Sequence, residues 1–399
     1  MRSVALMFLL GDFRALLPKH LATQAQTLEW LARAHTRAEA QLALEEGRAF
    51  DEAAFLASIT RRLRRFGCGD DKIATRGHES DDCSHVRWAE MEVYRLSERG
   101  AGAGTRARTK AFGRIARAAL SRLFAEAESP PRQLIHVTCT GYESPSAAQL
   151  LVAAKGWGSR TRVSHAYHMG CYAALPALRM ASGYAALEPA ASGALGAEAR
   201  VDIVHTELCS LHFQPLRHDP EQLVIQSLFA DGCIAYSLFP EGSARGRDPA
   251  LAVLSQDEWI VPDSADSMAW FCSDFGMEMV LARDVPEKIA RSLSSFVAGL
   301  LHQAGQTSAA TESAVFAIHP GGPKIVDQIA LALKLREPQV ELSRRVLRER
   351  GNMSSATLPH IWQAVLRSAA VAMGDLVVSL AFGPGLTLSG AVLRKVAAA

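Results

Sequence analysis

The sequence predicts a layered α/β protein in which buried strands alternate with amphipathic helices. Apolar runs with strand character, such as RQLIHVTCT and ARVDIVHTEL, are separated by segments with helical spacing, such as TKAFGRIARAALSRLFAEAE. The alternation runs through both halves of the chain, which favours helices packed on sheets. With 399 residues, of which 49% are hydrophobic, the chain can bury a large core.

The first half is expected to begin with a buried strand in the apolar run that starts at Val4. A helix ending at Gly47 follows, and then a helix with Asp51 as its N-cap and Gly67 at its end. A largely irregular stretch over residues 68–110 comes next. The remaining elements of this half are expected in the order helix 109–128, strand 132–140, strand 161–169, helix 172–187, strand 199–208, helix 220–232 and strand 233–240.

The second half repeats strands and helices after a Gly/Arg/Pro turn at Gly242–Asp248. This turn is the expected boundary between two similar halves, residues 1–242 and 243–399. The elements expected in this half are strand 251–261, helix 286–305, strand 313–320, helix 324–335, helix 343–352, helix 357–371 and the strand pair 375–385 and 386–396.

Composition excludes several classes of function. The formal net charge of +2 lacks the basic excess of a nucleic-acid-binding protein, so no nucleic-acid partner is expected. The seven cysteines form no CxxC pair, which argues against a disulfide framework and a structural zinc site. No apolar run is long enough to span a membrane, and the N-terminal one is short for a signal peptide. We therefore expect a cytoplasmic enzyme without a bound metal.

The segment HMGCYAALPALRMA places Cys171 on a tight turn between a strand and a helix. The positive end of the helix dipole at such a turn favours the nucleophilic thiolate. The alternative is that Cys171 is a small buried core residue, as most unpaired cysteines are.

Two further segments place polar residues at active-site positions. FAIHPGGPKIVDQI puts His319 at the end of a buried strand, where an imidazole can donate to a thioester oxygen or move a proton. RERGNMSSA puts Asn352 after a glycine at a helix break. Alone, His319 could be a structural histidine and Asn352 a turn residue. The three segments together are far more specific.

In their order along the chain, HMGCYAALPALRMA, AIHPGGPKIVDQ, GNMSSA and AFGPGLT resemble the type III polyketide synthases, the family of chalcone synthase. The resemblance covers almost the whole chain, from GDFRALLPKH to the final strand. It implies a thiolase-like, five-layered αβαβα fold, an obligate homodimer and a narrow pantetheine tunnel. It also implies that Cys171 carries the acyl chain while His319 and Asn352 bind a thioester carbonyl. A thiolate–imidazolium pair would keep Cys171 ionised.

The same resemblance assigns further residues to substrate binding. Ser144, in TGYESPS, matches a position that crosses the dimer interface, where the plant enzymes have a larger residue. His212, in CSLHFQP, matches a bulky aromatic gatekeeper beside the nucleophile. These two departures put chalcone-type products in doubt. The glycine-rich loop that shapes the product cavity corresponds to Phe382, Gly383, Pro384 and Gly385 within Phe382–Thr387.

The segment RRFGCGDDKIATRGHE, together with MGCYAALPALR, is similar to the free-standing ketosynthases of the myxopyronin and corallopyronin type. Those enzymes join two β-keto acyl chains delivered by carrier proteins and release an α-pyrone. A basic cluster that includes Arg61 and Arg65 suits a coenzyme A phosphate or an acidic carrier-protein helix. It equally suits a solvated helix face.

Three hypotheses follow for function. The first is a ketosynthase that condenses a Cys171-bound chain with a second β-keto acyl thioester and closes an α-pyrone, as in antibiotic biosynthesis. Its substrates would arrive on the phosphopantetheine arm of acyl carrier proteins. The second is a type III synthase that extends fatty acyl-CoA with malonyl-CoA to alkylpyrones or alkylresorcinols. The third is a non-catalytic partner that only binds acyl carriers.

Overall fold

A computed structural model describes residues 7–187, 199–242 and 248–397. Its centre is a nine-stranded mixed sheet with the strand order β11-β12-β13-β8-β1-β7-β6-β4-β5. The strands of this sheet are β1 (Phe8–Ala15), β4 (Gln133–Thr138), β5 (Arg162–Tyr167), β6 (Val201–Leu208), β7 (Asp231–Pro240), β8 (Ala250–Ile260), β11 (Val315–Ile318), β12 (Leu376–Gly383) and β13 (Thr387–Val396).

The direction of the strands divides this sheet. At one end β4 pairs in parallel with β5 and with β6, and at the other end β11 pairs in parallel with β12. Antiparallel pairs connect these two ends, with β1 between β7 and β8. The predicted final strand pair is confirmed, since β12 runs antiparallel to β13.

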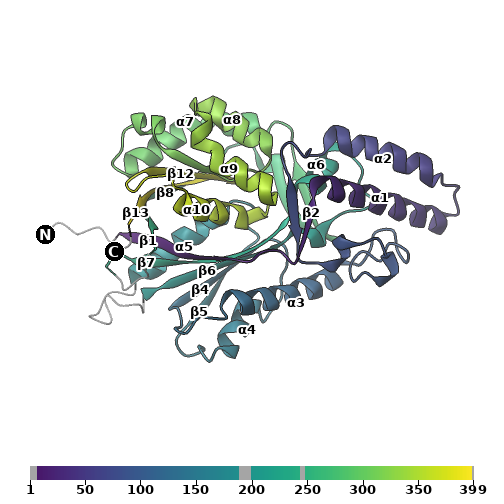
Figure 1. Ribbon diagram of the computed structural model, residues 1–399, viewed down its shortest axis with the longest axis horizontal. Coiled ribbons are helices and arrows are strands. Elements are labelled where there is room, and N and C mark those ends of the chain that lie inside the picture. Colours follow the sequence, from purple (N-terminus) through teal and green to yellow (C-terminus); the bar gives the residue numbers. More distant parts are fainter. Residues whose placement is uncertain (1–6, 188–198, 243–247, 398–399) are drawn as a thin grey trace.

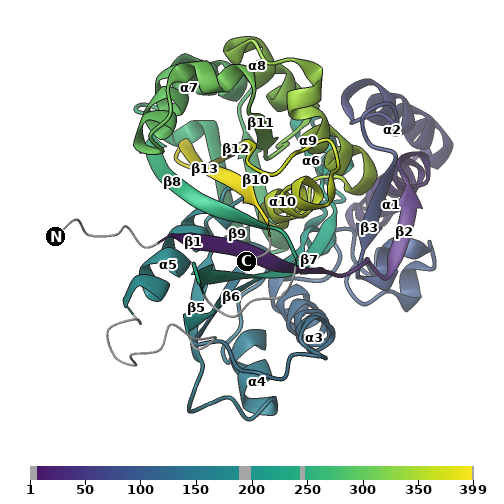
Figure 2. The same cartoon turned by 60° about the vertical axis from the view of Figure 1, so that its left-hand side comes forward.

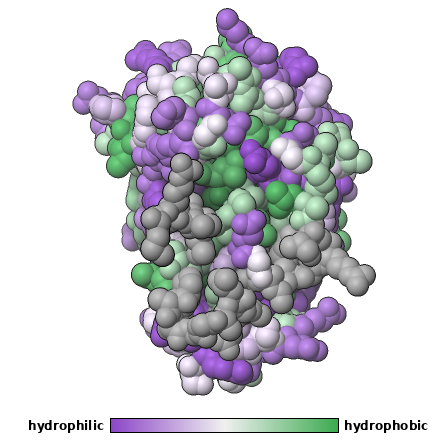
Figure 3. Space-filling view, turned by 90° about the vertical axis from the view of Figure 1, so that its left-hand side faces the viewer, coloured by the Kyte–Doolittle hydropathy of each residue, from purple (hydrophilic) through white to green (hydrophobic). Residues whose placement is uncertain are grey.

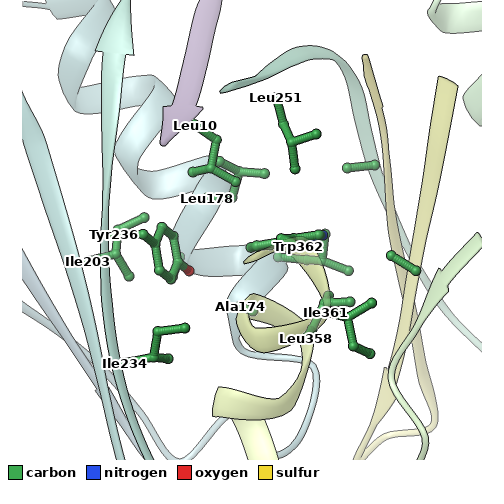
Figure 4. Packing of buried hydrophobic residues seen from close by; sticks show 14 of the residues in the cluster. Leu10, Ala174, Leu178, Ile203, Ile234, Tyr236, Leu251, Leu358, Ile361 and Trp362 are labelled. Atoms are coloured by element: carbon green, nitrogen blue, oxygen red, sulfur yellow. The ribbon is translucent and has the colours of Figure 1, made fainter. Parts of the chain in front are cut away.

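Two helices fill the middle of the molecule, between the two ends of the sheet. They are α5 (Ala174–Leu187) and α10 (Thr357–Arg367). Figure 4 shows Leu178 of α5 and Trp362 of α10 between strands on either side, with Tyr236 of β7 facing Trp362. The Trp362 indole also donates a hydrogen bond to the Ser379 hydroxyl at 2.8 Å. This central cluster fixes the segments on which the candidate site lies.

Further helices cover the outer faces, as Figure 1 shows. On the side of β11–β13 these are α7 (Val285–Gln303) and α8 (Pro323–Leu333), and on the side of β4–β6 they are α3 (Thr105–Leu123) and α4 (Ala147–Ala154). Helix, sheet, helix, sheet and helix therefore follow one another, which confirms the predicted thiolase-like αβαβα layers.

The remaining elements surround the edge of the layers. Figure 1 shows α1 and α2 projecting at one end, next to α6. These elements are α1 (Gln24–Glu46), α2 (Glu52–Phe66), α6 (Pro220–Leu228), α9 (Glu337–Arg350) and the small strand pairs β2 (His20–Thr23) with β3 (Thr75–His78) and β9 (Met268–Ser273) with β10 (Gly276–Leu281).

The sequence signals for helix ends are confirmed for α1 and α2. Helix α1 ends at Gly47, whose φ of +66° is the left-handed conformation that glycine adopts most readily. The Asp51 carboxylate accepts a hydrogen bond from the Ala54 N–H at 2.9 Å and caps α2, which ends at Gly67.

The structure differs from the expected elements at several points, and one expected turn cannot be compared. The first strand begins at Phe8 and extends to Ala15, while residues 1–6 lie outside the described residues. Helix α4 was not expected, although a capping box of Ser146 and Gln149 marks its start. The turn proposed as the boundary of the halves falls mostly on residues 243–247, also outside the described residues, so the boundary stays a prediction.

Figure 3 shows one face of the molecule, where hydrophobic residues gather above the middle of the view among mostly hydrophilic ones. Across the described ranges, no helix combines the length and the apolar character that a membrane span requires.

Candidate active site

Cys171 lies in the turn between β5 and α5, as the sequence predicted. Backbone geometry makes the turn tight, because His168 and Gly170 both have positive φ values, +61° and +80°. A Cβ atom on Gly170 would lie 2.6 Å from Pro384 Cδ, so only glycine fits there without displacing that loop. The Gly170 N–H donates to the Cys139 sulfur at 3.0 Å, which ties the turn to the end of β4.

Asn352 lies where α9 ends and the chain turns toward α10. Its backbone forms a bridge beside Phe229, donating to the Leu228 carbonyl at 3.0 Å and accepting from the Ala230 N–H at 2.8 Å. Its side-chain Oδ1 accepts from the Ser354 N–H at 2.9 Å. These bonds fix the carboxamide, which is fully buried.

The structure brings Cys171 and this turn together. The Cys171 Sγ lies 3.8 Å from the Ser354 hydroxyl. The Asn352 carboxamide lies close enough to affect the thiol, since both Ser354 and Asn352 partly offset the raised pKa of Cys171. Ser354 itself has a φ of +50°, a strained conformation of the kind that clusters at functional sites.

His319 directly follows β11, with its backbone N–H bonded to the Leu380 carbonyl at 2.8 Å. The loop after it borders the segment that holds Asn352, because a Cβ on Gly322 would lie 3.8 Å from Leu228 Cδ2. Leu228 is the residue whose carbonyl accepts the Asn352 N–H. The loops that carry His319 and Asn352 therefore meet at Leu228.

Three donor or acceptor atoms at this site lack a hydrogen-bond partner among the described residues. They are both ring nitrogens of His319 and the Nδ2 of Asn352. Leaving a buried polar group unpaired costs about 1–3 kcal/mol. Donors kept unpaired in a dry site are suited to an oxygen that arrives with a substrate, because negative charge developing on it would be stabilised strongly there.

Burial keeps the nucleophile and the histidine uncharged in the ligand-free protein. It raises the pKa of the Cys171 thiol to about 12, with Ser354 and Asn352 lowering it and Glu207 raising it. Burial likewise lowers the pKa of His319 to about 3. This differs from the thiolate–imidazolium pair expected from the sequence, because neither side chain has enough water or opposite charge around it to stay ionised.

Glu207, at the end of β6, was missed by the sequence analysis. Its carboxyl group accepts from the Cys139 N–H and the Thr140 hydroxyl, each at 3.0 Å, and from the Ser355 hydroxyl. Burial raises the pKa of Glu207 to about 7, and the three hydrogen bonds partly offset this. The available signal was an acidic residue at the end of a buried strand, in VHTELCS.

The glycine-rich loop lies against the nucleophile turn. A Cβ on Gly383 would overlap the Tyr172 ring, and Pro384 contacts Gly170, so this loop encloses Cys171 from one side. Gly385 has a φ of +125° and turns the chain into β13. Phe382 instead packs in the cluster beneath α7 and α8.

His212 follows β6 in the segment CSLHFQP, and its role as a gatekeeper beside the nucleophile stays a prediction. Its Nε2 donates to the Thr140 carbonyl at 2.7 Å, and its Nδ1 accepts from the Met277 N–H at 3.1 Å. Burial lowers the pKa of His212 to about 3, so the ring is neutral. His212 contacts Trp270 edge to face and borders a cavity that residues of α1, α6, β9 and β10 also line.

The other predicted site residues lie on the surface. Ser144 is exposed on the loop between β4 and α4, two residues before Ser146, whose hydroxyl bonds to His165 of the edge strand β5. Arg61 and Arg65 are exposed one turn apart on α2, and Arg65 lies over the Phe66 ring at 5.2 Å. Their roles stay predictions. Within the described ranges, no group of three His, Cys, Asp or Glu side chains is arranged to hold a metal ion.

Comparisons with known proteins agree with this geometry. Residues 107–239 match the family described as chalcone and stilbene synthases, N-terminal domain, and residues 252–397 match the C-terminal domain of the same family. Type III polyketide synthase C of Arabidopsis thaliana is 29% identical over 266 residues, which cover 66% of this chain and 67% of that protein. Type III polyketide synthase A of the same plant is 27% identical, with 66% and 65% covered.

Solved structures share the fold over nearly the full length. PKS-I from the brown alga Ectocarpus siliculosus superposes with a TM-score of 0.82 at 21% identity, covering 99% of this chain and 100% of that one. The 1,3,6,8-tetrahydroxynaphthalene synthase of Streptomyces coelicolor has a TM-score of 0.77 at 22% identity, covering 98% and 100%. With both family domains matched around Cys171, His319 and Asn352, the chain belongs to the chalcone and stilbene synthase family, the type III polyketide synthases.

Proposed function

We propose that the protein is a ketosynthase that joins two acyl chains and closes an α-pyrone. The Cys171 sulfur attacks the thioester carbonyl of the first chain and releases the carrier thiol. The α-carbon of a second β-keto acyl thioester then loses a proton and attacks the carbonyl of the Cys171 thioester, which breaks the C–S bond and releases the Cys171 thiolate to take up a proton. An enol oxygen finally attacks the remaining thioester carbonyl, closes the ring and frees the second carrier.

The observation that carries this proposal is that buried polar atoms of His319 and Asn352 lack a hydrogen-bond partner among the described residues. Asn352 lies close enough to lower the pKa of the Cys171 thiol, and the loop of His319 borders the Asn352 segment at Leu228. Each such donor stabilises a developing oxyanion by about 3 kcal/mol in a dry site.

The surface of α2 supports delivery by an acidic carrier protein. Arg61 and Arg65 are exposed one helical turn apart and so share a face. The end of α2 packs on α6, because a Cβ on Gly67 would lie 3.2 Å from the Ser227 side chain. Ser227 precedes Leu228, which borders the His319 loop and bonds to Asn352. A carrier held at this helix would therefore present its pantetheine arm near the site.

We further propose a homodimer in the cytoplasm. Strand β5 is the edge of the nine-stranded sheet and its outward backbone groups have no neighbouring strand among the described residues. An unprotected edge of this kind is ready to pair with a second chain. Ser144 lies two residues before Ser146, which bonds to this edge strand, so Ser144 would reach the partner.

The rival within the family extends a fatty acyl-CoA with malonyl-CoA. Purified protein should be given matched chains on carrier protein and on coenzyme A, with malonyl-CoA present or absent, and the products weighed. Pyrone formation from two carrier-bound β-keto chains without malonyl-CoA supports the proposal. Products formed only from acyl-CoA and malonyl-CoA would replace it with the rival.

A carrier-binding protein without catalysis remains the other class of function. It would bind acyl carriers with no change in the mass of the protein. An acyl adduct on the protein would exclude it.

A further inference from the structure

A small cavity lies between α1, β3, α6 and the β9–β10 hairpin. It has a volume of about 70 Å³ and is lined by aromatic and sulfur-containing side chains, among them Trp30, Trp270 and Met277. Two basic residues of β3, Arg76 and His78, also line it. Figure 2 shows β3 beside β2 and next to α1. This strand falls in the segment RRFGCGDDKIATRGHE, which the proposed mechanism does not use.

Arg76 and His78 point to the same side of β3, because they are two residues apart on one strand. Gly77 between them faces the other way, since a Cβ there would overlap Pro18. Both side chains are at least nine-tenths buried, with exposed fractions of 1% and 5%. The strand therefore presents two basic groups together inside the protein.

The Arg76 guanidinium is held rigidly by three hydrogen bonds, none of them to a carboxylate. Its Nε donates to Gln24 Oε1 at 2.9 Å, and its Nη1 donates to the carbonyls of Gln226 and Phe229 at 2.8 Å each. The Nη2 atom has no partner among the described residues. These bonds fix the plane of the guanidinium, so its free nitrogen has a set direction.

No described acidic side chain forms an ion pair with Arg76. The groups that raise the pKa of Arg76 are the thiols of Cys83 and Cys68, which would do so only as thiolates. Burial raises the pKa of both thiols, that of Cys68 to about 11. Both are therefore neutral near pH 7. Burial lowers the pKa of Arg76 to about 10, which still leaves it charged. A buried charge without a counter-ion is unfavourable, and an anion in the cavity would relieve it.

His78 adds a second unpaired group. Neither of its ring nitrogens has a hydrogen-bond partner among the described residues. Burial, followed by the nearby Arg76 and His20, lowers the pKa of His78 to about 3, so the ring is neutral with one N–H to donate. The cavity thus offers one cationic and one neutral donor from the same strand face.

We propose that this cavity binds a compact two-oxygen anion, either a carboxylate or the enolate of a 1,3-dicarbonyl group, through Arg76 and His78. Both ions carry two oxygens on one side, so that one oxygen can accept from Arg76 and the other from His78. Both are also small enough for a cavity that would hold only a few water molecules. The anion has two sources: a free carboxylate, or the β-keto portion of an acyl chain bound at the active site. The second source rests on the proposed function.

Cys209 and Phe229 place the cavity beside the reaction centre. Both line it. Cys171 lies close enough to Cys209 to raise the pKa of the Cys209 thiol, after the larger effects of burial and of Glu207 and Asp231, and Phe229 forms the backbone bridge with Asn352. A β-keto chain carried by Cys171 would therefore have a dry, cationic recess within its reach.

The first arm of the test measures binding without any turnover. Acetate and acetoacetate are titrated into the protein by calorimetry at constant ionic strength, with chloride as the reference anion. Binding of the two carboxylates but not chloride, weakened about tenfold in His78→Phe, supports the site, since tenfold corresponds to about 1.4 kcal/mol. His78→Gln, which keeps a donor, should bind better than His78→Phe. His20→Phe is the control, because His20 pairs with His78 across β2 and β3 but does not line the cavity.

The second arm assigns the source of the anion. The rate of acyl transfer to Cys171 is compared for 3-ketoacyl and saturated acyl thioesters of equal length. If the chain supplies the anion, His78→Phe slows the 3-ketoacyl substrate about tenfold and leaves the saturated one unchanged. If only the free carboxylates respond to the variant, the site binds a free anion. If His78→Phe changes neither carboxylate binding nor the 3-ketoacyl rate, the inference is overturned, even when Cys171 is acylated. If no thioester acylates the protein, the proposed function is overturned, and the binding measurement alone then decides whether this anion site exists.

Discussion

Replacing His319 by phenylalanine separates a catalytic role from a structural one, because the two roles predict opposite results. The imidazole is buried, and neither of its nitrogens bonds to a described residue. Removing it therefore breaks no hydrogen bond that folding supplies. A buried polar group without a partner costs about 1–3 kcal/mol, so the free energy of unfolding of His319→Phe should stay level or rise by up to that amount.

The same substitution should strongly reduce condensation. Loss of one oxyanion donor lowers the rate by about 10² to 10³, which corresponds to roughly 3–4 kcal/mol of transition-state stabilisation. Urea unfolding, followed by the fluorescence of the six tryptophans, measures stability. Mass spectrometry of the products measures condensation on the same preparation.

His360 provides a matched control, since it is also a buried histidine but bonds to the protein. Its Nδ1 donates to the Ala356 carbonyl at 2.8 Å, whereas its Nε2 has no partner among the described residues. Because His360→Phe loses that one hydrogen bond, it should be about 1 kcal/mol less stable than His319→Phe relative to the parent protein and keep condensation within a few-fold of the parent rate. If His319→Phe were the less stable variant and still condensed at the parent rate, the assignment of His319 as an oxyanion donor would be wrong.

Three other perturbations test the account. Alkylation of Cys171 by iodoacetamide in the ligand-free protein should rise steadily from pH 7 to pH 9, because the thiol pKa is about 12; a plateau near pH 6 would indicate a preformed thiolate. Glu207 has a pKa raised from 4.5 to about 7, so its contribution to stability is present below pH 4.5 and is lost as the pH rises to about 7. The unfolding free energy of Glu207→Gln should therefore increase relative to that of the parent protein by about 1.4 kcal/mol for each unit of pH rise across this range. A difference that stays constant with pH in urea titrations would contradict the raised pKa of Glu207. Gly383→Ala places a methyl group on the Tyr172 ring and should lower stability by about 1–3 kcal/mol in the same assay, whereas Gly156→Ala, where the added atom meets nothing within 4 Å, isolates the cost of a positive φ.

Local signals in the sequence predicted most elements of the fold. Asp51 and Gly67 marked the ends of α2 because caps satisfy backbone groups that the helix itself leaves free. Helix α4 was missed because AAQLLVAA is apolar on nearly every side and has no helical period. The β9–β10 hairpin was also not predicted from the sequence, since its strands carry mixed polar and apolar residues on a partly exposed surface.

The site could be predicted only in part from local patterns. The turn around Cys171 has its own signature, but the loops of His319 and Asn352 meet through Leu228, a contact between distant parts of the chain. Their joint assignment therefore depended on the family resemblance. The neutral state of Cys171 and His319 and the carboxyl group of Glu207 depend on burial, which the sequence does not state.

The most direct measurement is peptide mass spectrometry of the protein after brief exposure to a carrier-bound acyl thioester. The account predicts one acyl group, located on Cys171, with Cys139 and Cys209 unmodified as internal controls, and no adduct in Cys171→Ala. An acyl group that persists in Cys171→Ala, or that is found on another cysteine of the parent protein, would contradict the assignment of Cys171 as the nucleophile.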